Sequence, residues 1–169
     1  MDEPRERGAK FFGALTSQIH LHRQSRYAYN LRWIMTQSNH HQLAREFFAA
    51  LTNGEVPDSL LMPDMTMWST SSPTWSTKAR FQAGIKLLAS VFNGGLHYTV
   101  DSITAEEDRI AAEVQARGTL INGETYQMRY VFMLRVHDGR IASVAEHNDP
   151  VPVRERLGPL MQAVMARAK

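Results

Sequence analysis

The sequence predicts an α+β fold in which helices come first and one curved antiparallel sheet follows. Two stretches, from about Asn39 and from about Lys78, carry apolar residues at helical spacing. The second half of the chain instead holds four strand-length runs, rich in aromatic and β-branched residues and separated by short polar turns. Consecutive strands joined by short turns form an antiparallel meander, so we expect the helices to cover one face of that sheet.

The first 38 residues are expected to form an extension, and residues 39–169 a single domain. Within the extension, Lys10 to Ser25 has a helical pattern. This helix would pack on its own domain or on a partner subunit, and a basic helix on a membrane surface is the alternative. Met35 is an alternative start, because the domain begins just after it.

The first helix of the domain should begin near Asn39, since Asn39 and Gln42 have the spacing of a capping box. Its apolar face would consist of Leu43, Phe47 and Leu51. Asn53-Gly54 should end it. A short second helix over Val56 to Leu61 is expected next.

A break in the chain is predicted at Pro63-Asp64, before two short strands at Met65 to Ser69 and Thr74 to Thr77. A longer helix follows from about Lys78, and Asn93-Gly94-Gly95 should end it. Its core positions would be Phe81, Ile85, Leu88 and Phe92.

The four strands of the meander are expected at Leu96 to Thr104, Ile110 to Leu120, Thr125 to Val136 and Arg140 to Asn148. Asp138-Gly139 should form the tight turn of the last hairpin. A final helix over Val153 to Arg167 should be kinked at Gly158-Pro159.

Composition excludes several classes of function. Residues 1–34 hold six Arg/Lys and three Asp/Glu, which gives this segment a charge of +3. Because the net charge of the chain is +2, the remaining residues carry −1. This charge predicts that the domain does not bind nucleic acid. The chain has no cysteine, which excludes disulfides and cysteine metal sites and fits the cytoplasmic location that we expect. No run approaches the ~18–20 apolar residues of a membrane span, and no signal peptide is recognisable, so no membrane partner is expected.

Known cofactor motifs are missing from the sequence. There is no glycine-rich phosphate loop, no Gly-x-Ser-x-Gly and no dinucleotide-binding fingerprint. We therefore expect no cofactor.

One set of positions in the last two predicted strands and their turns carries a family resemblance: Asn122, Gly123, Tyr126, Tyr130, Phe132, Asp138, Gly139, Arg140, Ile141, Glu146 and Asp149. With these residues the two strands resemble those of the SnoaL-like polyketide cyclase and ketosteroid isomerase-like families, which share the nuclear transport factor 2-like fold. In element order the resemblance extends from about Asn39 to Pro150. It implies a cone in which the curved sheet and the N-terminal helices enclose an apolar pocket.

Glu146 is the candidate catalytic residue, because an acid on this strand often acts as acid or base in the families that the chain resembles. A carboxyl among apolar side chains is desolvated, which raises its pKa toward the working pH. The alternative is a structural acid that bonds loop amides or pairs with Arg129. Substrate-binding candidates are Trp68, Tyr130, Phe132 and Asp149, although Asp149 is also expected to cap the end of the strand.

His147 should point to the opposite sheet face from Glu146, since side chains alternate along a strand. The two therefore make no dyad, and we expect no metal site. The steroid isomerase residues are absent: Trp68-Ser69-Thr70 contains no acid, and Phe132 or Met133 replaces the acid of the penultimate strand. The arginine with two acids that epoxide hydrolases of this fold use is also missing around Arg129.

The strand from Thr125 to Val136 is apolar on both faces. Tyr130, Phe132 and Leu134 would share one face, and Val131 and Met133 the other. The chain has too few helices to cover both, so we expect a homodimer through the outer face, which the resemblance also implies.

Glu146 and the family resemblance together predict acid/base isomerase, cyclase or hydratase chemistry on a small hydrophobic molecule. A non-catalytic ligand-binding or adaptor dimer is the alternative.

Overall fold

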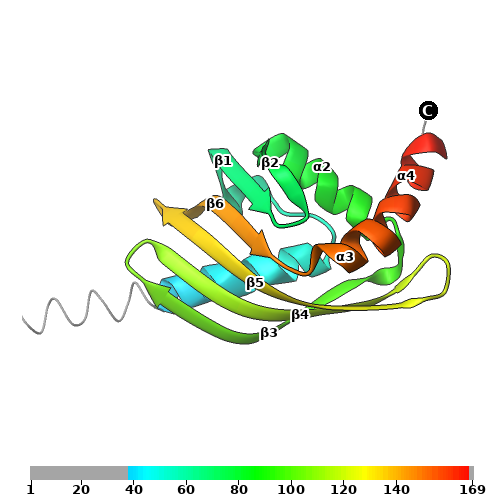
Figure 1. Ribbon diagram of the computed structural model, residues 1–169. Coiled ribbons are helices and arrows are strands. Elements are labelled where there is room, and N and C mark those ends of the chain that lie inside the picture. The colour runs from blue at the N-terminus through cyan, green and yellow to red at the C-terminus, as the bar shows by residue number, and fades with distance from the viewer. Residues whose placement is uncertain (1–37, 168–169) are drawn as a thin grey trace, which may run out of the picture. The chain divides into compact units, whose positions relative to one another are not determined.

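The computed structural model describes residues 38–167, and Figure 1 shows their arrangement. The first helix is present from residue 38 to residue 52, and the chain turns at Asn53-Gly54, where Gly54 has φ +73°. Residue 38 is already helical, so the predicted capping box at Asn39 is wrong. The predicted extension, with its helix over Lys10 to Ser25 and with Met35, lies outside the described residues apart from residue 38.

The sheet has six strands in the order β2-β1-β6-β5-β4-β3. Their bounds are β1 Leu61–Ser69, β2 Ser72–Thr77, β3 Phe92–Glu106, β4 Arg109–Leu120, β5 Thr125–His137 and β6 Arg140–His147. The antiparallel meander of β3 to β6 is confirmed. The sheet as a whole is mixed, because β1 pairs with β6 in parallel. Parallel pairing needs a long crossover, which the connection through β2, α2 and the meander provides.

Two strand boundaries differ from the prediction. Pro63 and Asp64 lie inside β1, where the register with β6 shifts between Leu61 and Thr66, so the missing N–H of Pro63 breaks no regular ladder. The glycines of Asn93-Gly94-Gly95 do not end a helix. They lie inside β3 at another register shift, with φ of +80° and +88°.

The hairpin between β5 and β6 turns as predicted. Asp138 and Gly139 have φ of +47° and +70°, the pair of positive values that a type I′ turn requires. This turn fixes the register of β6 on β5, in which Phe132 faces Glu146.

The helices after the first one vary in type. The 3-10 helix η1 covers Asp58–Leu60, and α2 covers Lys78–Ala89 with Thr77 as its N-cap. α3 (Pro150–Pro152), a π-helical turn η2 (Val153–Leu157) and α4 (Gly158–Arg167) follow one another without a break. The kink predicted at Gly158-Pro159 is this π turn, in which the Gly158 N–H bonds the Val153 carbonyl.

The core lies between the first helix and the inner face of the sheet. β5 alternates strictly between buried and exposed residues, which confirms the two faces expected for it. Phe132 on the inner face is 2% exposed, and its ring centroid lies 5.1 Å from that of Phe48 and 6.4 Å from that of Phe47. Within residues 38–167 no helix is long and apolar enough to cross a membrane.

Candidate functional site

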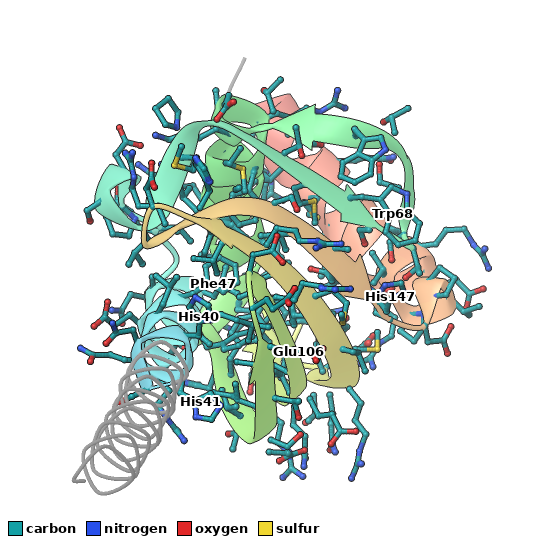
Figure 2. All side chains as sticks on the ribbon, turned by 90° about the vertical axis from the view of Figure 1, so that its left-hand side faces the viewer. His40, His41, Phe47, Trp68, Glu106 and His147 are labelled. Atoms are coloured by element: carbon teal, nitrogen blue, oxygen red, sulfur yellow. The ribbon has the colours of Figure 1, made fainter. Side chains whose placement is uncertain are left out.

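Glu146 lies near the end of β6, on the inner face of the sheet. It is paired with Ser69 of β1 and with Phe132 of β5. His147 points the other way, as predicted: it is exposed, and its ring centroid lies 5.3 Å from that of Trp68 (Figure 2). The acid and the histidine are therefore on opposite faces.

The two oxygens of the Glu146 carboxyl have different surroundings. Oε1 accepts hydrogen bonds from Ser69 Oγ at 3.0 Å and from Asn148 Nδ2 at 2.6 Å. Oε2 has no hydrogen-bond partner among residues 38–167. No fully buried side-chain oxygen or nitrogen of that range lacks a partner, so Oε2 is reached from the cavity that Glu146 lines. One oxygen is held and the other is free.

The two donors to Glu146 are themselves fixed by the turn between β1 and β2. The Ser71 N–H bonds Ser69 Oγ at 3.1 Å, and Ser71 Oγ bonds Asn148 Oδ1 at 2.7 Å. Thr70 Oγ1 bonds the same Asn148 oxygen at 2.8 Å. Neither Ser69 nor Asn148 was a predicted site residue. Asn148 could have been found from its position two residues after Glu146, which places both on one side of the chain.

Burial raises the pKa of the Glu146 carboxyl above its ordinary value of 4.5, and the hydrogen bonds from Ser69 and Asn148 oppose that rise less strongly. The predicted alternative partner, Arg129, is exposed on the outer face of β5. No ion pair joins Glu146 to a basic residue within the described part of the chain. A raised pKa brings the titration of this carboxyl closer to the working pH, as general acid/base catalysis requires.

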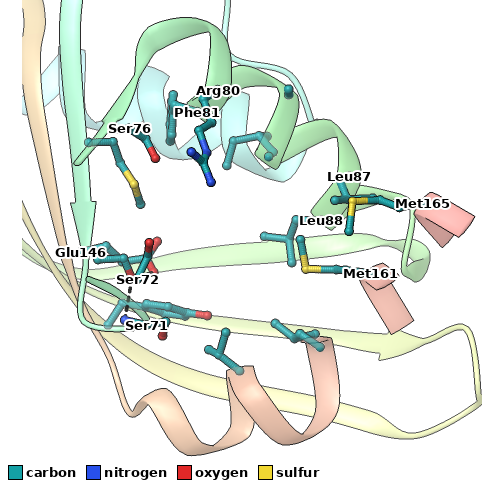
Figure 3. A pocket seen from close by; sticks show the side chains of 18 of the residues that line it. Ser71, Ser72, Ser76, Arg80, Phe81, Leu87, Leu88, Glu146, Met161 and Met165 are labelled. Atoms are coloured by element: carbon teal, nitrogen blue, oxygen red, sulfur yellow. Dashed lines mark hydrogen bonds between the residues drawn. The ribbon is translucent and has the colours of Figure 1, made fainter. Parts of the chain in front are cut away.

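The cavity in front of Glu146 has a volume of about 540 Å³ and lies between α2, α4 and the inner face of the sheet (Figure 3). Leu87 and Leu88 of α2 face Met161 and Met165 of α4 at one end. The polar side chains at its walls are Ser69, Ser71, Ser72, Ser76, Arg80, Tyr98, Tyr130 and Glu146. The volume is in the range of about 300–1,000 Å³ that is typical of small-molecule sites.

Two tyrosines line the same cavity. Tyr130 was a predicted site residue, and its hydroxyl lies 3.3 Å from that of the buried Tyr126. Tyr98 of β3 was not predicted, and its ring centroid lies 6.3 Å from that of Tyr130. Burial raises the pKa of both Tyr98 and Tyr130 above 10.0, so both hydroxyls stay protonated and can donate hydrogen bonds.

The remaining predicted residues lie outside the cavity lining. Trp68 is on the outer face of the sheet, because its neighbours Met67 and Ser69 take the inward positions of β1. Phe132 is in the core below the cavity. Asp149 is the N-cap of α3, where its Oδ1 accepts from the Val151 N–H at 2.9 Å, whereas the sequence suggested a cap at the end of the strand.

Metal-ligand clusters are not found in this region. Within residues 38–167, no group of three or more His, Asp or Glu side chains is arranged to hold a metal ion.

Comparisons with known proteins identify the family and the fold. A family model described as SnoaL-like domain matches residues 44–144. AclR, a candidate hydroxylase from Streptomyces galilaeus, is 22% identical with a TM-score of 0.61, and the match covers 70% of this chain and 96% of that one. IdmH, a candidate polyketide cyclase from Streptomyces antibioticus, is 22% identical with a TM-score of 0.60 over 70% of this chain and 97% of that one.

A nuclear transport factor 2-like protein from Anabaena variabilis is also similar, with 22% identity and a TM-score of 0.57 over 66% of this chain and 87% of that one. The structural similarity to these proteins shows that the chain has the nuclear transport factor 2-like fold, as the sequence predicted. No curated protein matches the chain.

Proposed function

The protein belongs to the SnoaL-like domain family, and we propose that it catalyses acid/base isomerisation, cyclisation or hydration of a small hydrophobic molecule without a cofactor. The observation that carries the proposal is the Glu146 carboxyl. It is half-buried, its pKa is raised, and its free oxygen faces a largely apolar cavity of about 540 Å³. The similarity to a candidate polyketide cyclase supports the same class of chemistry.

In this proposal Oε2 of Glu146 moves the proton. Ser69 and Asn148 hold Oε1, so the carboxyl keeps its orientation while Oε2 accepts a proton from one substrate atom and returns it to another. The hydroxyls of Tyr98 and Tyr130 line the same cavity and would donate hydrogen bonds to a substrate oxygen that gains negative charge.

Glu146→Gln is the direct test. Glutamine can accept the same hydrogen bonds at Oε1, but its amide nitrogen cannot take the proton that Oε2 would take. We expect the rate of conversion to fall about 10²–10⁴-fold, measured on the best substrate from a panel of steroids, terpenoid epoxides and polyketide fragments. Glu155→Gln, at an exposed position outside the cavity, is the control and should leave the rate unchanged.

Equal rates for the wild type and Glu146→Gln would contradict the assignment. If the wild type binds members of the panel but converts none, the protein is the non-catalytic ligand-binding alternative. Circular dichroism of both variants shows whether the fold is kept.

A further inference from the structure

A second charged side chain faces the cavity from the wall opposite the sheet. Arg80, an exposed residue in the first turn of α2, lines the cavity and points its guanidinium toward the side that holds Glu146 and Ser72 (Figure 3). Among the residues that line this cavity, all of them described, Arg80 is the one basic side chain and Glu146 the one acidic side chain.

Arg80 has no counter-ion in the described part of the chain. Lys78, the other basic residue of this turn, pairs with Asp58 at 2.8 Å. Arg80 makes no side-chain hydrogen bond or ion pair within residues 38–167, and its backbone N–H bonds Thr77 Oγ1 at 3.5 Å. Glu146 is held by Ser69 and Asn148 instead. The guanidinium therefore presents its donors to whatever occupies the cavity.

The surroundings of Arg80 add to its positive charge. The first turn of α2 itself contains no acidic residue, and the Asp58 carboxylate beside it is paired with Lys78. The positive end of the helix dipole therefore adds to the charge at Arg80. Ser72 and Ser76 of β2 line the same cavity and carry hydroxyls that can donate hydrogen bonds. The other end, between α2 and α4, is apolar, with Leu87, Leu88, Met161 and Met165.

We propose that the cavity takes an amphipathic anion, in which Arg80 binds a carboxylate or sulfonate group and the apolar body lies between α2 and α4. This inference names the substrate class for the proposed function and rests on the same cavity. A planar guanidinium binds such oxyanions through two parallel hydrogen bonds, which also fixes their orientation. Arg80 would thus set the position of the substrate relative to Glu146.

Two fluorescent probes of the same shape test the inference without turnover. 1-Anilinonaphthalene-8-sulfonate carries one negative charge, and N-phenyl-1-naphthylamine is the same molecule without it. Arg80→Gln should weaken binding of the anionic probe about tenfold or more, because hydrogen bonds to charged groups are the strong ones, and should leave binding of the neutral probe unchanged. Arg80→Lys should give an intermediate loss, since it keeps the charge but loses the planar fork.

Arg45→Gln is the matched control, because it removes one positive charge from an exposed position outside the cavity lining. It should leave both dissociation constants unchanged. The proposal is overturned if the wild type binds neither probe, if Arg80→Gln weakens both probes equally, or if it weakens neither. Since these are binding measurements, they stay separate from the rate test on Glu146: a charge-selective loss can stand even where Glu146→Gln keeps its activity.

Discussion

At the scale of single residues, the carboxyl of Glu146 combines two features that rarely occur together. It is buried enough for its pKa to rise, and it is still free at one oxygen. Ser69 and Asn148 both donate to Oε1, so the orientation of the carboxyl does not depend on Oε2. This division lets one atom react while the other stays in place.

The raised pKa makes the stability of the fold depend on pH in a defined direction. An acid that titrates higher in the folded state binds more protons there than in the unfolded chain, so its stabilising contribution is present below pH 4.5 and is lost as pH rises toward the folded pKa. Glu146→Gln does not titrate. The variant should therefore gain stability relative to the wild type as pH rises from 4 to 8, by about 1.4 kcal/mol for each unit by which the pKa is raised.

Urea unfolding at several pH values, with both proteins compared at each one, measures this difference. Glu155→Gln, at an exposed position, is the control: its free energy of unfolding should change with pH in the same way as that of the wild type. If the free energies of unfolding of the wild type and Glu146→Gln differ by the same amount at every pH from 4 to 8, the pKa of Glu146 is not raised.

Which site residues could be predicted depended on whether the evidence was local. Strand alternation correctly separated Glu146 from His147. It could not orient Trp68, because Met67 and Trp68 are both large and apolar and either could face inward. Ser69 was missed because its bond to Glu146 joins residues 77 positions apart, and the pairing of β1 with β6 was not predicted.

At the scale of elements, two glycines have opposite structural roles. At Gly118 in β4, a Cβ atom would lie 2.7 Å from Phe92 Cδ1 and 2.9 Å from the Gly95 carbonyl oxygen. At Gly84 in α2, nothing lies within 4 Å of a Cβ atom. The same substitution should therefore have opposite effects at the two positions.

Gly118→Ala should lower the free energy of unfolding by about 1–3 kcal/mol, because the backbone of β3 must move to admit the methyl group. Gly84→Ala should raise it by about 0.5–1 kcal/mol, because alanine loses less conformational entropy in a helix. Urea titration of both variants beside the wild type measures the two values. A loss of stability in Gly84→Ala, or none in Gly118→Ala, would contradict the packing described for α2 or for β3 and β4.

Element types were predictable where the local pattern was strong, as in α2 and in the meander. The boundaries failed where a helix breaker lies inside a strand. Pro63, Gly94 and Gly95 were all expected to interrupt the chain, yet each lies in a strand next to a register shift. A bulge depends on the partner strand, so the residue types of one strand do not distinguish it from an end.

At the scale of the whole molecule, the register of the sheet sets a row of side chains on its outer face. Trp68 pairs with Ala145, Ala145 with Met133, and Met133 with Ala111, so the row crosses β1, β6, β5 and β4. Met133 is 37% exposed, and Val131, two residues before it, is 41% exposed. Neither is covered by a helix within the described chain. An apolar row of this kind favours contact with a second copy.

We predict that the protein is a homodimer through this outer face and that Val131→Lys together with Met133→Lys gives a monomer. In a two-fold interface each substituted residue occurs twice, so four lysines would be buried against one another or against apolar atoms. Size-exclusion chromatography with light scattering measures the mass. Ile121→Lys is the control, because Ile121 is 39% exposed but lies in the turn after β4, and it should keep the dimer. A monomeric wild type would contradict the predicted dimer. A double variant that still dimerises would show that the subunits contact each other through another surface.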